Sequence, residues 1–157
     1  MAFFQKTFNL KKGILYIGGT LAIAGVSTLL GMPKLDGLIR PPLTPPAWVF
    51  GVVWSILYLL MGYAAYRIAS SSSGDKSGAL KVYWLQLIVN ALWAPVFFRL
   101  EWRLFAFFWL LLLIVLIGRT IMRFSAVDST AAKLLYPYLA WCAFAAYLNL
   151  GFYLLNR

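Results

Sequence analysis

The side chains that could carry chemistry in this sequence are few, and most are amides or aromatic rings set within long apolar runs. Asn90 and Asn149 each lie within such a run, and Cys142 is the single cysteine. The sequence has no histidine and only four Asp or Glu residues. Catalysis that depends on His is therefore excluded, and we expect no metal site of the zinc type. Hydrogen bonding by amides and stacking on indole or phenol rings remain.

Three groups of these residues recur at helical spacing, so that each group shares one face of a helix. The groups are Trp54, Tyr58, Met61 and Ala65; Asn90, Trp93 and Phe97; and Trp141, Ala145 and Asn149. One interpretation is an aromatic pocket with two amides and a small floor at Ala145, suited to a flat apolar ligand. The other is packing, in which the asparagines bridge helices. For Asn90 and Asn149 the sequence favours neither.

The elements that must position these residues are membrane helices. Of the 157 residues, 63% are hydrophobic and 11% are charged, whereas soluble domains carry about 25% charged residues. A spanning helix needs roughly 20 apolar residues. Five stretches meet or approach that length, at residues 13–32, 46–68, 80–98, 104–122 and 133–155. We therefore predict an all-α integral membrane protein, a five-helix transmembrane bundle that forms a single domain over residues 1–157.

The net charge of +10 fits this prediction. Most Lys and Arg residues lie at the ends of the predicted helices, the pattern of anchoring to anionic lipid headgroups. No basic soluble module is present, so we expect no binding to nucleic acid. The positive-inside rule favours an N-terminus in the cytoplasm for this multi-pass chain, and it leaves open which membrane hosts the protein.

The first loop is rich in proline. Residues 41–48 read Pro-Pro-Leu-Thr-Pro-Pro-Ala-Trp, and proline fixes its own φ and restricts its predecessor. We expect a rigid cover that leads into the second helix. The residues assigned to this cover are Pro41, Leu43, Pro45, Pro46 and Trp48.

Two further prolines fall inside predicted helices. Pro95 removes the N–H that would bond the carbonyl of Ala91, and Pro137 does the same for Lys133. In a membrane such a carbonyl needs a partner, so it should face protein or a cavity. Pro137 lies near a helix start, where its cost is small. Pro95 is the stronger candidate for a shaped cavity wall.

Three blocks of this sequence resemble the translocator protein family, also known as the tryptophan-rich sensory protein or peripheral benzodiazepine-receptor family. The blocks are Pro41-x-Leu43-x-Pro45-Pro46-x-Trp48 with Trp54 and Tyr58; Gln86-Leu87-x-x-Asn90-x-x-Trp93-x-Pro95; and Tyr136-Pro137 through Trp141, Ala145, Leu148 and Asn149. They occur in the family's order and spacing, which makes the resemblance specific. Leu43 departs from the pattern, because the family usually has a tryptophan there.

This resemblance implies a five-helix fold, commonly a homodimer, with a ligand pocket beneath the first loop. It implies ligands such as protoporphyrin IX and other tetrapyrroles, sterols, and synthetic isoquinoline or benzodiazepine compounds. The porphyrin would be a ligand, and we expect no cofactor. Carried over by motif, the pocket residues are Trp54, Asn90, Trp93, Trp141, Ala145 and Leu148. Phe105 stands where animal members carry a pocket tryptophan, and the helical spacing adds Tyr58.

The leading hypothesis is a membrane protein that binds tetrapyrroles and has a regulatory or transport role. An alternative is an enzyme that degrades porphyrin under light and oxygen, for which Trp54 and Trp141 would be the reactive residues. A third is a non-catalytic scaffold that senses stress. On this hypothesis the second, third and fifth helices build the site, while the first and fourth are mainly structural.

Overall fold

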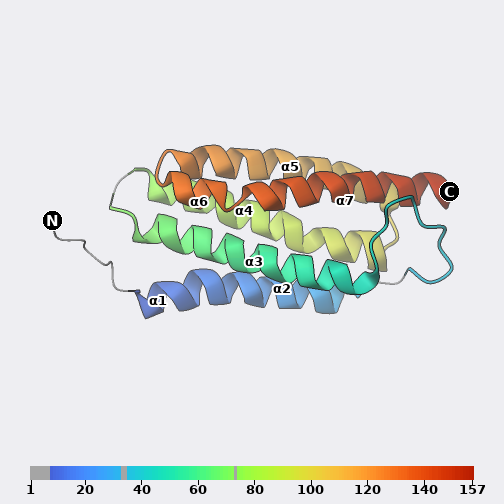
Figure 1. Cartoon of the computed structure of the whole chain (residues 1–157), viewed down its shortest axis with the longest axis horizontal. Helices are drawn as coiled ribbons and strands as arrows, with labels where there is room; N and C mark the ends of the chain where they lie inside the picture. Colours follow the sequence, from blue (N-terminus) through green and yellow to red (C-terminus); the bar gives the residue numbers. More distant parts are fainter. Residues whose placement is uncertain (1–7, 33–34, 73) are drawn as a thin grey trace.

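The computed structural model describes residues 8–32, 35–72 and 74–157, and all regular structure within these ranges is helical. The elements in order are α1 (Leu10–Gly13), η1 (Ile14–Gly18), α2 (Gly19–Leu30), α3 (Ala47–Ser70), α4 (Lys76–Ala94), η2 (Pro95–Arg99), α5 (Arg103–Ser125), α6 (Ser129–Lys133) and α7 (Tyr136–Leu155). The long helices lie side by side along the longest axis of the molecule (Figure 1).

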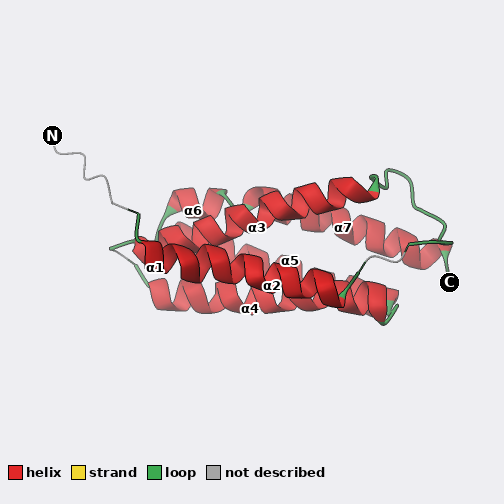
Figure 2. Ribbon diagram, turned by 90° about the horizontal axis from the view of Figure 1, so that it is seen from below, coloured by secondary structure: helices red, strands yellow, loops and turns green. Residues whose placement is uncertain are grey.

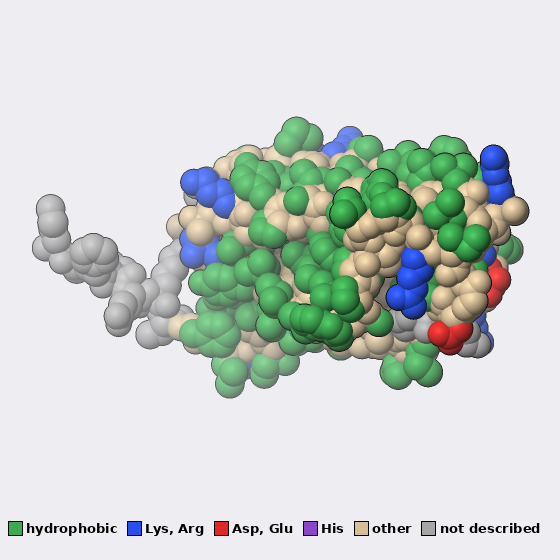
Figure 3. All heavy atoms as spheres, turned by 45° about the vertical axis from the view of Figure 1, so that its right-hand side comes forward, with side chains coloured by type: hydrophobic (Ala, Val, Ile, Leu, Met, Phe, Trp, Pro, Cys, Tyr) green, Lys and Arg blue, Asp and Glu red, His purple; other side chains and the backbone are tan. Residues whose placement is uncertain are grey.

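Five helical stretches of the described chain are long and apolar enough to cross a membrane. They run over Leu10–Leu30, Ala47–Ser70, Lys76–Arg99, Arg103–Ser125 and Ser129–Leu155. The prediction of a five-helix, all-α membrane bundle is confirmed, and each predicted stretch overlaps one of these spans. Many large apolar side chains are exposed along the helices, as Leu29 and Val115 are. Hydrophobic side chains cover much of the face shown in Figure 3, which is the surface that lipid requires.

Local sequence signals explain where several helices begin. Asn9, Asp75 and Asp128 each accept a hydrogen bond from a backbone N–H in the first turn of α1, α4 and α6, as N-cap residues do. Pro137 is the second residue of α7, where its missing N–H costs little. The sequence prediction for Pro137 is therefore confirmed.

The tightly packed core lies among α3, α4, α5 and α7. Met61, Tyr83, Leu113, Tyr138 and Cys142 are all fully or almost fully buried there. The helical stretch formed by α1, η1 and α2 lies against α3 and α4. Seen from below, α2 and α3 diverge toward the end of the bundle that carries the first loop (Figure 2).

Candidate functional site

A cavity of about 630 Å³ lies where α2 and α3 diverge, and it falls in the size range of small-molecule sites, roughly 300–1,000 Å³. Helices α2, α3, α4 and α7, together with η2, supply its walls. The lining side chains that the site depends on are Ser27 and Thr28 of α2; Phe50, Trp54, Ser55 and Tyr58 of α3; Asn90 and Trp93 of α4; Phe97 and Phe98 of η2; and Ala145, Leu148, Asn149 and Phe152 of α7. None of the described lining residues is Lys, Arg, Asp or Glu.

Two glycines set the position of α2 around this cavity. A Cβ atom on Gly62 would lie 2.9 Å from Cα of Ile17, so α3 and η1 touch through their backbones. A Cβ atom on Gly31 would lie 2.6 Å from the carbonyl carbon of Ala94, so the end of α2 touches the end of α4. Between these two contacts α2 stays close to α4 and leaves α3, which opens the cavity.

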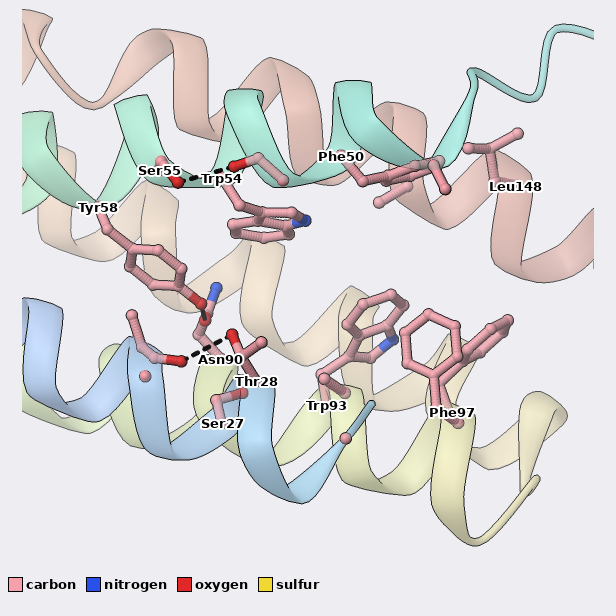
Figure 4. A pocket seen from close by; sticks show the side chains of 18 of the residues that line it. Ser27, Thr28, Phe50, Trp54, Ser55, Tyr58, Asn90, Trp93, Phe97 and Leu148 are labelled. Carbon is pink, nitrogen blue, oxygen red and sulfur yellow. Dashed lines mark hydrogen bonds between the residues drawn. The ribbon is translucent and has the colours of Figure 1, made fainter. Parts of the chain in front are cut away.

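The cavity has an aromatic half, defined here by Phe50, Trp93, Phe97, Phe98 and Phe152. The Trp93 ring stacks on Phe97 with centroids 5.3 Å apart. Trp54, on the α3 wall, lies across the cavity from Trp93 on the α4 wall (Figure 4). Two indoles on opposite walls can hold a flat apolar ligand between them.

The other half is polar, defined here by Ser27, Thr28, Ser55, Tyr58 and Asn90. Asn90 joins two helices to its own, because its Oδ1 accepts from the Tyr58 hydroxyl at 2.6 Å and its Nδ2 donates to the Tyr138 hydroxyl at 2.8 Å. The Tyr138 hydroxyl in turn donates to Oε1 of Gln86 at 2.8 Å. Asn90 therefore bridges α3, α4 and α7 and also borders the cavity.

Asn149 makes a second bridge, on the aromatic side. Its Oδ1 accepts from Nε1 of Trp93 at 3.1 Å, and its Nδ2 donates to the backbone carbonyl of Arg103 at 2.7 Å. The bond to Trp93 fixes the orientation of an indole that lines the cavity. Both asparagines thus serve the helix-bridging role that the sequence left open.

The carbonyl of Ala91, which Pro95 leaves without its usual donor, has a partner on another helix. The hydroxyl of Ser27 on α2 donates to it at 2.8 Å. The prediction that the freed carbonyl faces protein is confirmed. Pro95 itself is not among the residues that line the cavity, although Ala94 and Phe97 on either side of it are. Immediately after this point the helix widens into η2, where the Leu100 N–H bonds the Pro95 carbonyl at 3.0 Å.

The structure brings six of the eight predicted ligand-binding residues to the cavity: Trp54, Tyr58, Asn90, Trp93, Ala145 and Leu148. Trp141 is not among the lining residues. The centroids of the Trp141 and Phe50 rings are 5.7 Å apart in an edge-on contact, and Trp141 also packs beside Phe144. Phe50 lines the cavity, so it stands nearer the cavity than Trp141 does. Phe105 is also elsewhere, because it is 49% exposed and packs against Trp102 and Trp109 on the outside of α5.

The predicted loop cover lies beside the cavity and against α7. Pro41 is buried and would contact a Cβ atom on Gly151, and the Tyr147 hydroxyl donates to the Pro42 carbonyl at 2.9 Å. Leu43, at φ 66°, is exposed, as are Pro46 and Trp48, while Pro45 is half-buried. None of the five cover residues is among those that line the cavity.

The first helix contributes more than the sequence suggested. The α2 wall includes Ala24, Ser27, Thr28 and Gly31, which fall at i, i+3, i+4 and i+7. Small and hydroxyl side chains at that spacing in an otherwise apolar helix were the available signal for this wall. The interpretation of the first helix as mainly structural is wrong in this respect.

Comparison with known proteins supports one family. The sequence pattern of the TspO/MBR family matches residues 13–154. The chain is 43% identical to the translocator protein of Ovis aries over 71% of this chain and 68% of that protein. It is 40% identical to the translocator protein of Homo sapiens over 76% and 72% of the two chains. It is 37% identical to the tryptophan-rich sensory protein of Cereibacter sphaeroides over 73% and 71%.

Proposed function

The chain belongs to the TspO/MBR family, and we propose that it binds tetrapyrroles such as protoporphyrin IX, together with other flat hydrophobic ligands, in the cavity between α2, α3, α4 and α7. Its role would be regulatory or in transport, since ligand binding within an integral membrane protein serves either. The single observation that carries the proposal is the pair Trp54 and Trp93 on opposite walls of an apolar cavity (Figure 4).

The proposed binding mode follows from the shape of the site. The macrocycle lies between the two indoles and packs against Phe97 and Phe152 of the aromatic half. Trp141 contributes through Phe50, which it supports from behind. None of the lining residues that the structure describes is Lys or Arg, so the ionised carboxylates of a porphyrin would stay near the membrane surface, because burying them unpaired is costly.

The test is a titration of the purified protein in detergent with protoporphyrin IX, followed by the shift of its main visible absorption band. Replacing Trp54 or Trp93 by Leu should weaken binding about tenfold, the effect of losing one stacked ring with its buried area. Trp102→Leu is the matched control, because Trp102 is 59% exposed and lies outside the cavity. Equal affinities in all four proteins would contradict the proposal.

A second candidate, breakdown of porphyrin under light and oxygen, is favoured by the position of Trp54 in the cavity wall. Illumination in air distinguishes the two. More than one porphyrin consumed per protein molecule, with loss of turnover in Trp54→Phe, would support the enzyme. Bleaching that is independent of Trp54 would support binding alone.

A further inference from the structure

The polar half of the cavity contains four hydroxyl groups that have already donated their protons. Ser27 donates to the Ala91 carbonyl at 2.8 Å, and Tyr58 donates to Oδ1 of Asn90 at 2.6 Å. Thr28 donates to the Ala24 carbonyl at 3.0 Å and Ser55 to the Gly51 carbonyl at 2.7 Å. In Figure 4 these side chains gather at one end of the cavity, away from Phe97 and Leu148.

Among these four hydroxyl groups, Ser27 has the strongest reason to keep its proton in its present hydrogen bond. Its acceptor, the Ala91 carbonyl, cannot receive the usual helical bond from residue 95, because that residue is proline. An unpaired carbonyl within a membrane span is costly, so the Ser27 proton is held in this bond. Ser27 is itself only 5% exposed.

Tyr58 is held by a chain of buried groups. Its acceptor Asn90 is 3% exposed, and the other end of that amide is fixed by its bond to Tyr138. Tyr138 continues the chain to Gln86. Turning the Tyr58 hydroxyl toward a ligand would therefore leave the Asn90 oxygen without a partner.

A hydroxyl whose proton is committed still has an oxygen lone pair that can accept. The polar half thus offers the cavity hydroxyl acceptors, and no charged side chain lines the described walls that could balance a buried ion. We propose that this half is a subsite for a neutral hydrogen-bond donor, an O–H or N–H group on an otherwise apolar ligand, and that Ser27 and Tyr58 select for it.

This subsite rests on the proposed function, since it takes the cavity as the ligand site. It also gives the ligand an orientation. The flat apolar body lies in the aromatic half between Trp54 and Trp93, and the donor group points toward Ser27 and Tyr58. A ligand that offers only acceptors at that end finds the hydroxyl protons of Ser27 and Tyr58 already committed and binds less tightly.

The experiment compares two neutral porphyrins, haematoporphyrin dimethyl ester, which carries two hydroxyethyl groups, and its dimethyl ether, in which a methyl group replaces each hydroxyl hydrogen. Each is titrated into the detergent-solubilised protein and followed by absorption. The diol should bind about three- to tenfold more tightly than the diether, which corresponds to one hydrogen bond. In Ser27→Ala and in Tyr58→Phe this ratio should fall toward one.

Ser125→Ala is the matched control, because Ser125 makes the same kind of hydroxyl-to-backbone bond, to the Met122 carbonyl at 2.8 Å, in a position outside the cavity. It should keep the wild-type ratio. Two variants on different helices guard against a folding defect in either. A ratio near one in the wild type, or a ratio unchanged in both Ser27→Ala and Tyr58→Phe, would overturn the subsite.

Protoporphyrin IX titrated into the same preparations separates this subsite from the proposed function. If protoporphyrin IX binds and the diol and diether bind equally, the subsite is wrong and tetrapyrrole binding stands. If none of the three porphyrins binds to the folded protein, both proposals fail.

Discussion

The contact between the first and second membrane spans is closed at one end and open at the other. At the closed end, a Cβ atom on Gly62 of α3 would lie 2.9 Å from Cα of Ile17 and 3.2 Å from the carbonyl oxygen of Tyr16. At the open end, the same two spans form facing walls of a cavity of about 630 Å³. Because Gly62 has no side chain, the two spans touch at this crossing. Beyond it they diverge, and the cavity lies in the space between them.

Hydroxyl groups behave differently at the two ends. At the closed end, Thr20 and Tyr83 are both fully buried, and their hydroxyl oxygens are 2.6 Å apart. Thr20 donates to the Tyr16 carbonyl at 2.5 Å, so Tyr83 donates to Thr20 and both protons are used within the protein. At the open end, the oxygens of Ser27 and Ser55 border a cavity after donating to carbonyls. The same chemistry seals one end and leaves acceptors for a ligand at the other.

The largest expected effect comes from filling the closed end. Gly62→Leu forces side-chain atoms into the backbone of η1, and overpacking of this kind costs about 3 kcal/mol. The unfolding temperature, followed by circular dichroism in detergent, should fall by about 6–12 °C for a chain of this size. Gly118→Leu is the control, because a Cβ atom there meets nothing within 4 Å. Equal unfolding temperatures would contradict the close crossing.

A smaller loss is expected from Asn90→Leu at the boundary between core and cavity. The change leaves the Tyr58 hydroxyl without its acceptor and the Tyr138 hydroxyl without a donor, at a cost of about 1–3 kcal/mol. Urea or thermal unfolding in detergent measures it. The double variant Tyr58→Phe/Asn90→Leu should be more stable than Asn90→Leu alone, because it has no Tyr58 hydroxyl left without an acceptor. A stability equal to wild type would show that Asn90 does not bridge the helices.

The first loop, at the open end, is attached to the end of α7 through Asn156, and removing this attachment should change only the local hydrogen exchange. Asn156 accepts from the Ile39 N–H at 2.8 Å and donates to the Ile39 carbonyl at 2.9 Å, and both groups are exposed. Asn156→Ala should speed hydrogen exchange at Ile39 roughly fivefold, for a loss near 1 kcal/mol. The unfolding temperature should hardly change. Unchanged exchange in a peptide that contains Ile39 would contradict this attachment of the loop to α7.

The smallest effect is expected beyond the closed end, at the ion pair between Arg67 and Asp128. Nη2 of Arg67 lies 2.8 Å from Oδ2 of Asp128, and the two side chains are 33% and 19% exposed. Arg67→Met should cost less than about 1 kcal/mol, with a difference that shrinks as salt rises. Protoporphyrin IX affinity should stay unchanged. A large loss of affinity would mean that this end also shapes the cavity.

The sequence predicted the features that depend on local rules. Continuous apolar runs predicted five spans, and the missing N–H of Pro95 predicted a carbonyl that needs a partner. The sequence could not name that partner. Ser27 is 64 positions from Ala91 along the chain, and only the packing of α2 on α4 brings the two together.

Helical spacing also could not tell which residues on one helix face line the cavity. Trp141, Ala145 and Asn149 share a face of α7, yet Ala145 and Asn149 line the cavity and Trp141 does not, because Phe50 of α3 packs against it. Phe105 was placed at the site by resemblance alone, and α5 turns it to the outer surface. Whether a residue on a helix face lines the cavity depends on which neighbouring helix packs against that residue. Local sequence patterns do not carry this information.

The most direct test of the account fills the open end without touching a ligand contact made by a side chain. Gly25 lines the cavity, and a Cβ atom there meets nothing within 4 Å. Gly25→Phe should keep the wild-type unfolding temperature within a few degrees and weaken protoporphyrin IX binding by at least about tenfold, because the ring occupies the ligand's space. Gly118→Phe on the outside of α5 should leave affinity unchanged. Wild-type affinity in folded Gly25→Phe protein would show that the ligand binds elsewhere.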